Sequence, residues 1–339
     1  MSESQPSWEA AIDGIDYPDA DAAQRVRHDQ QQPGAIQFGV LGELAVWVAS
    51  VQGSAPPHDF HRVRALLIAG DHGIAAAGVS ARNAGATAAE VAGLSAGARP
   101  ANELAELAGA TVRPVDVAVD AEATPAGAEF KVRRGSGSID REDALTAEET
   151  ELALATGVRL ADAEIDAGAD LIVLGDLGVG STTVAATLIS IQTDTEPTKV
   201  VGRSCGIDDP TWIAKCAAIR DARRRGRAHR GELLDVLRVA GGADFAVLVG
   251  VILQSANRRT PVLVDGVVTA AAALLAQSVN ARIVRWIRAA QLTEEPAHAI
   301  ALDRLGLTPI LDLHLATGEA IGALTAVPIL RAAIRSAGA

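Results

Sequence analysis

Residues 170–183 read DLIVLGDLGVGSTT, and this stretch decides the fold. Its apolar run at 171–174 is bounded by turn-forming residues and is too short for a helix, which indicates a buried strand. Glycines follow at 175, 178 and 180, and a helix is expected to begin after them. The stretch therefore predicts a strand, a glycine-rich loop and a helix in direct succession, which is the repeating unit of an α/β fold.

The same alternation continues on both sides of this stretch. We expect further strands at residues 64–69, 111–119, 199–201 and 261–264, and helices at 41–51, 88–107, 146–167 and 267–277. The helix at 146 opens with a capping box, in which Thr146 is the N-cap and Glu149 closes it. Residues 1–40 are polar and predict a loosely ordered entry to the fold. Apolar strands separated by helices predict a doubly wound, mostly parallel, Rossmann-like sheet.

Composition narrows the class of protein. The chain has 339 residues, a net charge of −12, nine aromatic residues and two cysteines. This charge excludes an electrostatic grip on nucleic acid or anionic lipid, and so few aromatic side chains exclude a base-stacking platform. Two cysteines cannot form a disulfide scaffold and indicate a reducing compartment. The 69 alanines and 32 glycines allow helices to pack closely on a sheet.

The chain ends and apolar runs predict where the protein resides. Residues 1–21 are acidic and contain no basic segment followed by an apolar one, so no secretory signal is expected. The longest apolar runs, 245–256 and 266–281, fall short of the ~20 residues of a membrane-spanning helix. We therefore expect buried helices there, a cytoplasmic protein, and neither a membrane nor a nucleic acid as partner.

Glycine-rich loops mark the expected ligand site. Ligands of open parallel sheets bind outside the carboxyl ends of the strands, and four loops leave such ends here: residues 70–73, 175–183, 202–209 and 265–266. In GDLGVGSTT the glycines let the backbone approach a ligand, and the next helix offers N–H groups and a positive dipole end to a phosphate. The glycine order GxxGxG is neither a dinucleotide fingerprint nor a Walker loop. A generic glycine-rich turn is the alternative to a phosphate or ribose site.

Two carboxylates in these loops are candidate catalytic groups. Asp176 lies just beyond the strand at 171–174, and Glu319 lies between Gly318 and Gly322 ahead of an apolar helix. Each carboxylate also has a purely structural interpretation. Asp176 can act as a helix cap, and Glu319 can stabilise the N-terminus of the helix that follows it, an interaction of ~0.3–1 kcal/mol. Local sequence leaves both alternatives open.

Histidines and cysteines give no sign of a metal site. His58 and His61 share helical spacing, but no cysteine or carboxylate nearby completes a ligand set. His72 follows a strand end and is expected to be buried and hydrogen-bonded. The basic cluster at 220–230 is expected to be a solvated helix face and loop. No metal and no cofactor are therefore expected.

Many collinear segments carry a resemblance to a known family. They read AGDHGIAAAGVS (69–80), RRGSGSI (133–139), ALTAEE (144–149), GADLIVLGDLGVGSTTVAA (168–186), VVGRSCGIDDPTWIAK (200–215), RRTPVLVDG (258–266), EPAH (295–298), LGLTPILDL (305–313) and GEAIGA (318–323). In order and spacing the chain resembles the nicotinate-nucleotide:dimethylbenzimidazole phosphoribosyltransferases. The resemblance implies a doubly wound α/β domain, a small helical domain built from both chain ends, and a homodimer.

The resemblance also implies an activity and a set of residue roles. The phosphoribosyl group of nicotinate mononucleotide would pass to a benzimidazole-like base, giving an α-ribazole-phosphate-type nucleotide and nicotinate in cobalamin lower-ligand activation. Glu319 matches the general base, and Asp176 matches a carboxylate that stabilises positive charge on the ribosyl carbon. The aromatic base is expected at Ser80, Leu177 and Thr317. Ribose and phosphate are expected at Gly175, Gly178, Gly180, Ser181, Thr182, Gly202, Arg203, Ser204, Gly206, Lys215, Asp265 and Thr293.

The chain departs from the family pattern at several of these positions. Ala316 stands where the family has a phosphate-binding arginine, for which Arg82, Arg134 and Arg203 are candidate replacements. Ser181 replaces an asparagine, and residues 81–86 lack the usual tyrosine and proline. The family's GHxSxEPGH becomes AQLTEEPAH at 290–298. The general base is retained while the phosphate and base pockets differ.

Three functions are compatible with this pattern. The first is an active phosphoribosyltransferase of this family, with a benzimidazole-like or other azaheterocyclic acceptor or a changed donor. The second is a non-catalytic, nucleotide-binding homologue, or one subunit of a heterodimer with a paralogue. A dehydrogenase is a distant third, because the first-turn GxGxxG is missing. We expect three segments. Residues 63–285 form the α/β nucleotide-binding core, residues 1–62 form the N-terminal part of the small helical domain, and residues 286–339 form the C-terminal part with the Glu319 loop and the final helix.

Overall fold

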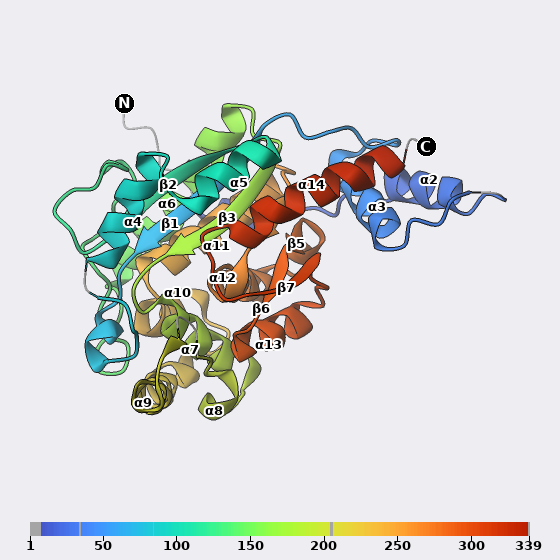
Figure 1. Ribbon diagram of the computed structural model, residues 1–339. Helices are drawn as coiled ribbons and strands as arrows, with labels where there is room; N and C mark the ends of the chain where they lie inside the picture. Colours follow the sequence, from blue (N-terminus) through green and yellow to red (C-terminus); the bar gives the residue numbers. More distant parts are fainter. Residues whose placement is uncertain (1–7, 34, 84, 204–205, 338–339) are drawn as a thin grey trace.

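A five-stranded parallel sheet organises the molecule. In a computed structural model, which describes residues 8–33, 35–83, 85–203 and 206–337, the strand order is β2-β1-β3-β4-β5 (Figure 1). The strands are β1 (Val63–Gly70), β2 (Ala110–Ala118), β3 (Leu171–Leu177), β4 (Val262–Val264) and β5 (Ile287–Ala289). Every neighbouring pair in this sheet is parallel. The predicted α/β class and its parallel, doubly wound sheet are confirmed.

The two central strands form the core of the sheet. β1 and β3 pair in register from Val63 with Leu171 to Ala69 with Leu177. Almost every residue of both strands is buried, as expected for a parallel sheet covered on both faces. The strands predicted at 64–69, 111–119, 170–174 and 261–264 are therefore present, whereas β5 is an element that the sequence did not reveal.

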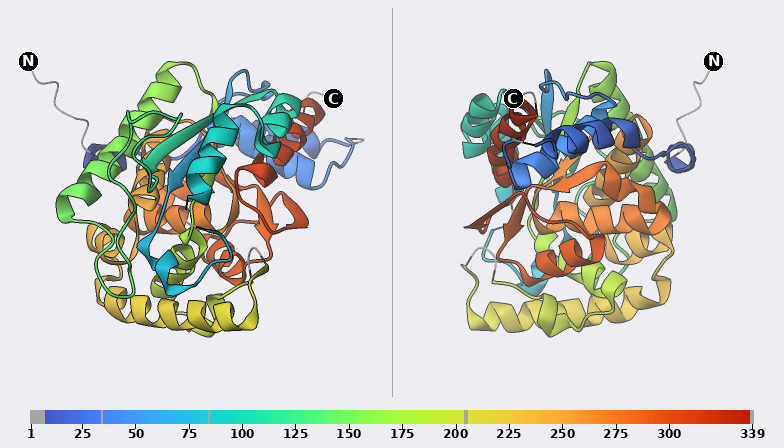
Figure 2. Two further views of the ribbon diagram at one scale, coloured as in Figure 1. Left: turned by 60° about the vertical axis from the view of Figure 1, so that its left-hand side comes forward. Right: turned by 90° about the vertical axis from the view of Figure 1, so that its right-hand side faces the viewer.

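Helices cover both faces of the sheet. Helices α4 (Ala86–Ser95) and α5 (Pro100–Ala108) lie on one face, and α11 (Ala243–Asn257) packs on the other with α6 (Ala147–Asp166) outside it (Figures 1 and 2). The predicted capping box opens α6: Glu149 N donates to Thr146 Oγ1 at 3.1 Å, and Thr146 N donates to Glu149 Oε2 at 2.9 Å. Proline at the start of α5 and Gly97 before it divide the single helix expected at 88–107.

The close approach of α6 and α11 requires glycine. A Cβ on Gly157 would lie 2.2 Å from the backbone oxygen of Val247, and a Cβ on Gly250 would lie 2.3 Å from that of Leu154. The two helices thus contact each other through their backbones. This is where the glycine-rich composition determines packing.

The chain ends form a small helical unit, as predicted. Helices α2 (Ala20–Gln30) and α3 (Val40–Gln52) pack together, and the C-terminal α14 (Ile321–Ser336) lies against α3 (Figure 2). The expectation of a loosely ordered segment over 1–40 is wrong for much of that range. Asp19 caps α2 by accepting a 2.7 Å hydrogen bond from Ala22 N, and the side chain of Val26 on this helix is buried in the core. The domain boundaries at 62 and 285 stay a prediction.

Further elements complete the fold, several of them around the carboxyl ends of the strands. They are α1 (Trp8–Asp13), η1 (Gly73–Ala77), α7 (Ser181–Thr193), α8 (Pro197–Val200), α9 (Asp209–Gly226), η3 (Arg227–His229), α10 (Leu233–Ala240), α12 (Gly266–Val279), η4 (Ala281–Arg285), β6 (Gln291–Thr293), α13 (Pro296–Leu305) and β7 (Leu311–Leu315). The strand expected at 199–201 is wrong, because Pro197 opens the short helix α8 there. Strands β6 and β7 form a separate parallel pair. No described helix is long and apolar enough to cross a membrane.

Candidate active site

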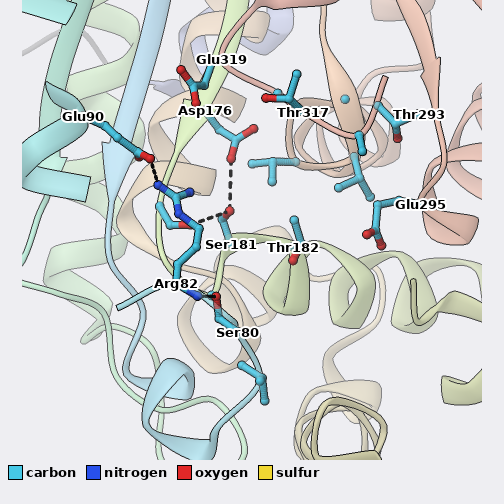
Figure 3. A pocket seen from close by; sticks show the side chains of 18 residues that line it. Ser80, Arg82, Glu90, Asp176, Ser181, Thr182, Thr293, Glu295, Thr317 and Glu319 are labelled. Carbon is cyan, nitrogen blue, oxygen red and sulfur yellow. Dashed lines mark hydrogen bonds and ion pairs between the residues drawn. The ribbon is translucent and has the colours of Figure 1, made fainter. Parts of the chain in front are cut away.

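A cavity of about 290 Å³ opens beyond the carboxyl ends of β3 and β4 (Figure 3). Many residues predicted for the site line it, from four separate parts of the chain. They are Ser80, Asp176, Gly178, Gly180, Ser181, Thr182, Thr293, Thr317 and Glu319. The fold thus brings both predicted carboxylates and the glycine-rich loop to one place.

Other predicted residues lie behind the cavity wall. Gly175 and Leu177 are buried in β3, and a Cβ on Gly175 would lie 2.5 Å from the backbone nitrogen of Ala320. Gly202 lies against Glu295, which lines the cavity, since a Cβ on Gly202 would lie 2.3 Å from the Glu295 carboxylate. Gly175 and Gly202 therefore allow the segments that line the cavity to pack closely against the residues behind them.

Two predicted residues face solvent. Arg203 is exposed, donates to Asp209 at 2.5 Å and lies over the ring of Trp212, and Gly206 is also exposed. Neither lines the cavity. Ser204 lies outside the described residues, so its predicted role is not addressed by the structure.

The glycine-rich loop lies tightly against β1. A Cβ on Gly178 would lie 2.2 Å from the Gly70 oxygen, and Gly180 has a φ of +94°, a conformation that favours glycine. Asp71 Oδ1 accepts a 3.3 Å hydrogen bond from Val179 N, and His72 N donates to Val179 O at 3.2 Å. The loop is therefore held between β1 and the N-terminus of α7.

The N-terminus of α7 has the features of an anion site. Gly180 provides the N-cap without a side-chain hydrogen bond, so the first turn presents its backbone to the cavity beside Ser181 and Thr182. Lys215 is 1% exposed, and its Nζ lies 3.0 Å from Thr182 Oγ1. A buried ammonium group so close to the helix N-terminus makes this end of the cavity electropositive.

Asp176 lies at the end of β3 and faces the cavity. Its Oδ2 accepts a 3.1 Å hydrogen bond from Ser181 Oγ. Desolvation raises the pKa of Asp176 to about 7, and the nearby Asp244 and Glu319 act in the same direction, while Ser181 and Arg82 act against it. A carboxyl group with a pKa near neutrality changes charge within the working range of an enzyme.

Glu319 lies in a strained turn ahead of α14. Both Glu319 and Ala320 have a φ of +60°, which is uncommon for residues with a Cβ. The turn is fixed from behind, since Asp265 Oδ2 accepts a 3.1 Å hydrogen bond from Gly322 N and Asp265 Oδ1 accepts one of 2.5 Å from Gln291. Desolvation raises the pKa of the fully buried Asp265 to about 7. Asp265 anchors the turn that carries Glu319, and its role in holding ribose stays a prediction.

A network of charged side chains lies around Glu319, and two of its members, Glu90 and Arg99, were not assigned from the sequence. Arg99 Nη2 donates to both of its carboxylate oxygens, at 2.6 and 2.7 Å, and lies 3.7 Å from Glu90. Glu90 in turn forms an ion pair with Arg82, and both of these residues line the cavity (Figure 3). The four side chains Arg82, Glu90, Arg99 and Glu319 are called the charged network below. Glu90 and Arg99 lie on or beside α4 and α5, where no motif identified them.

One arginine of the charged network lies where it can replace the arginine that the family pattern has at position 316. Ala316 lines the cavity, and of the three candidate replacements only Arg82 does so. Arg134 is paired with Asp120 on the surface, and Arg203 with Asp209. Among the described residues, Arg82 is therefore the one candidate replacement whose side chain reaches the site.

His72 is buried beneath the loop, as expected. Its Nε2 lies 3.0 Å from Asp244 Oδ2. Burial by itself would lower the pKa of His72, but the charges of Asp244, Asp71 and Asp176 raise it above the usual value. His72 thus lies below the loop, with its ring paired to a buried carboxylate. No group of three or more His, Cys, Asp or Glu residues in the described part of the chain could hold a metal ion.

A parallel α/β sheet with a glycine loop, an electropositive helix N-terminus and two carboxylates around one cavity defines an enzyme of the phosphoribosyl-transfer class. The sequence model of a family described as phosphoribosyltransferase matches residues 15–338. The chain belongs to this family, and within it to the nicotinate-nucleotide–dimethylbenzimidazole phosphoribosyltransferases.

The similar proteins include curated enzymes and solved structures. The chain is 48% identical over 324 residues to the nicotinate-nucleotide–dimethylbenzimidazole phosphoribosyltransferase of Mycobacterium ulcerans. The aligned region covers 94% of this chain and 90% of that protein. It is 49% identical, with the same coverage, to the enzyme of that name from Mycobacterium tuberculosis. The crystal structure of CobT from Thermus thermophilus superposes with a TM-score of 0.87 at 33% identity, covering 94% of this chain and 96% of that one.

Proposed function

We propose that this chain transfers the phosphoribosyl group of nicotinate mononucleotide to a ring nitrogen of a benzimidazole-like base. The products are an α-ribazole-phosphate-type nucleotide and nicotinate, and the reaction serves activation of the cobalamin lower ligand. One observation carries the proposal: Asp176 and Glu319 line the same cavity as the N-terminus of α7. The names of the relatives support the donor and acceptor classes.

The α7 end of the cavity suits the phosphate of the donor. Backbone N–H groups of the first helical turn, the hydroxyl of Thr182 and the buried Lys215 supply hydrogen bonds and positive charge there. A charge-assisted hydrogen bond of this kind contributes about 1.5–3 kcal/mol, so a single phosphate can be held without the arginine that Ala316 replaces.

Asp176 is suited to stabilise the reacting sugar. As the bond between C1′ and the nicotinate nitrogen breaks, its electron pair leaves with nicotinate and positive charge develops on the ribosyl carbon. An ionised carboxylate facing this carbon in a poorly solvated cavity lowers the energy of that state. The hydrogen bond from Ser181 keeps the Asp176 carboxylate oriented.

Glu319 is suited to accept the proton of the acceptor base. One ring nitrogen of the base attacks C1′, and the proton on its other ring nitrogen passes to the Glu319 carboxylate. Arg99 holds this carboxylate through both oxygens, which orients the base catalyst. Each carboxylate oxygen keeps a second lone pair, which can accept the proton of the substrate while Arg99 stays bound.

The proposal is tested by nicotinate release. Incubation with nicotinate mononucleotide and a panel of benzimidazoles and purines, followed by chromatography, is expected to show nicotinate and a new nucleotide. Glu319→Gln is expected to lower kcat by about 10²- to 10⁴-fold, because general-base catalysis contributes that much. Glu294→Gln, at an exposed position close to the cavity, is the matched control and is expected to retain full activity. No release with any acceptor, with Glu319→Gln equal to wild type, would refute the proposal.

A second candidate is a nucleotide-binding protein without activity, alone or as a partner of a paralogue. Two observations favour it. Ala316 lacks the guanidinium group that binds phosphate in the family pattern, and the Glu319 carboxylate is already bound by Arg99. Calorimetry that shows binding of nicotinate mononucleotide without turnover, or co-purification with a paralogue that restores turnover, would favour this function.

Assembly and location belong to the proposal as well. We propose a homodimer, with a heterodimer with a paralogue as the alternative, in the cytoplasm. Exposed apolar side chains near the small helical unit, such as Ile36 and Val40, offer a surface for a second subunit. Light scattering during size-exclusion chromatography measures the mass of the assembly. A monomer at micromolar concentration would refute the dimer.

A further inference from the structure

We infer that a cleft between the small helical unit and the edge of the sheet binds a phosphate group through Arg27, Arg285 and Arg288. These three residues are called the cleft arginines below. Among the described residues, none lines both this cleft and the candidate active-site cavity. The cleft is therefore a second binding site, and the inference does not depend on the proposed function.

The cleft arginines come from both parts of the fold. The cleft has a volume of about 640 Å³ and lies where α2 and α3 face η4 and β5. Figure 1 shows β5 beside α3, and β5 is the last strand in the order of the sheet. Arg27 lies on α2, whereas Arg285 ends η4 and Arg288 lies on β5. A ligand between them would therefore contact the small helical unit and the sheet at the same time.

Trp47 on α3 orders the sheet side of the cleft. Its Nε1 donates a 3.0 Å hydrogen bond to the backbone oxygen of Arg285, and its ring centroid lies 4.6 Å from Cζ of Arg288. Arg288 Nη1 donates to Ile287 O at 2.9 Å. Its Nε and Nη2 have no hydrogen-bond partner in the described part of the chain. The guanidinium is thus held against the ring with donors left for a ligand, and a preorganised group loses less entropy on binding.

The environment of Arg288 favours an anion as the ligand. Desolvation lowers the pKa of Arg288 to about 10, and the charge of Arg285 acts in the same direction, while Glu43 acts against it. The guanidinium therefore stays charged at neutral pH although it is poorly solvated and lies close to a second cation. An anion in contact with it offsets both unfavourable effects.

No carboxylate of the described residues neutralises the cleft arginines by an ion pair. Other arginines of the chain are paired in this way, as Arg331 is with Asp59. Two acidic residues also line the cleft, but Asp19 is engaged as the N-cap of α2, and Glu43 is exposed. The cleft keeps an excess of positive charge in a chain whose net charge is −12. Local charge of this kind attracts anions that the molecule as a whole repels.

The geometry favours phosphate over a carboxylate. Guanidinium groups bind either anion through parallel hydrogen bonds. A carboxylate has two oxygens, whereas a phosphate group offers three or four and can accept hydrogen bonds from three guanidinium groups that approach from different elements. A volume of about 640 Å³ also exceeds what one phosphate group fills. The two sources of this chemistry are free phosphate and the phosphoryl group of a larger metabolite.

The test counts the phosphate ions bound per chain by equilibrium dialysis with radiolabelled inorganic phosphate. Wild type is expected to bind one more phosphate than the double variant Arg285→Met/Arg288→Met, in which methionine keeps an apolar side chain beside Trp47. Arg27→Met is expected to weaken binding at this site by about 10- to 100-fold, the range for loss of a charge-assisted hydrogen bond. Arg304→Met removes an exposed arginine on α13 outside the cleft and is the matched control, expected to equal wild type.

Binding of phosphate at the N-terminus of α7 is common to wild type and all variants, so it cancels in this comparison. Equal numbers of bound phosphate in wild type and the double variant would overturn the inference. A loss in Arg304→Met as large as in Arg27→Met would also overturn it, since overall charge would then explain the binding. Arg27 is exposed, so Arg27→Met decides the question even if the double variant does not fold, as judged by circular dichroism.

A competition experiment distinguishes the two sources of phosphate. Unlabelled ribose 5-phosphate and unlabelled inorganic phosphate are each used to displace the label that depends on the cleft arginines. Displacement by ribose 5-phosphate at a lower concentration than by inorganic phosphate assigns the site to a phosphorylated metabolite. Displacement by inorganic phosphate at an equal or lower concentration assigns it to free phosphate. Displacement by neither compound would overturn the inference.

Discussion

Replacement of Asp176 by asparagine is expected to remove the acidic limb of the pH–activity profile. Desolvation raises the pKa of Asp176 to about 7. Only the ionised carboxylate stabilises positive charge on the ribosyl carbon. Because the pKa is raised, the active form is present above pH 7 and is lost as the pH falls through 7.

The size of the effect follows from the titration. With a pKa of about 7, roughly one-tenth of the enzyme is ionised at pH 6 and roughly one-hundredth at pH 5, so kcat/KM falls about tenfold per pH unit. Asp176→Asn keeps the shape of the side chain but carries no charge. We expect its rate at pH 8 to be about 10²- to 10³-fold below wild type, which corresponds to about 2.7–4 kcal/mol of lost stabilisation.

The assay measures kcat/KM for nicotinate release between pH 5 and pH 9. Asp303→Asn, at an exposed position on α13, is the matched control and should reproduce the wild-type profile. Arg82→Met should move the limb to higher pH, because the charge of Arg82 lowers the pKa of Asp176. An acidic limb near pH 7 that persists in Asp176→Asn would refute the reasoning.

Two predictions concern stability, measured by urea unfolding. Desolvation raises the pKa of Asp265 to about 7, so the folded state holds a proton that the unfolded state loses near pH 4. The unfolding free energy of Asp265→Asn relative to wild type should therefore increase by up to about 1.4 kcal/mol per pH unit between pH 4 and 7, and parallel curves would contradict this. Gly157→Ala should destabilise by about 1–3 kcal/mol, because its Cβ would lie 2.2 Å from Val247 O, whereas Gly42→Ala, 3.3 Å from a flexible glutamine side chain, is the control.

Local patterns in the sequence were sufficient for the elements that frame the site. The stretch at 170–183 predicted β3, its loop and α7, and Thr146 and Glu149 predicted the start of α6. These features depend on burial and hydrogen bonds between residues a few positions apart. In the polar segment before residue 40 the Asp19 cap was the one local sign of α2, and this helix is also stabilised by packing on α3. Likewise β5 is only three residues long and depends on its pairing with β4.

The charges around the general base were decided by the tertiary structure alone. The sequence indicated Glu319 and Asp176 as catalytic candidates, and the fold brings both to one cavity. It gave no sign that Arg99 would hold Glu319, because these residues are 220 positions apart. A strand or a cap leaves a periodic or local pattern along the chain, but an ion pair between distant segments leaves none. It forms only when the strand order of the sheet brings α4, α5 and the turn before α14 together.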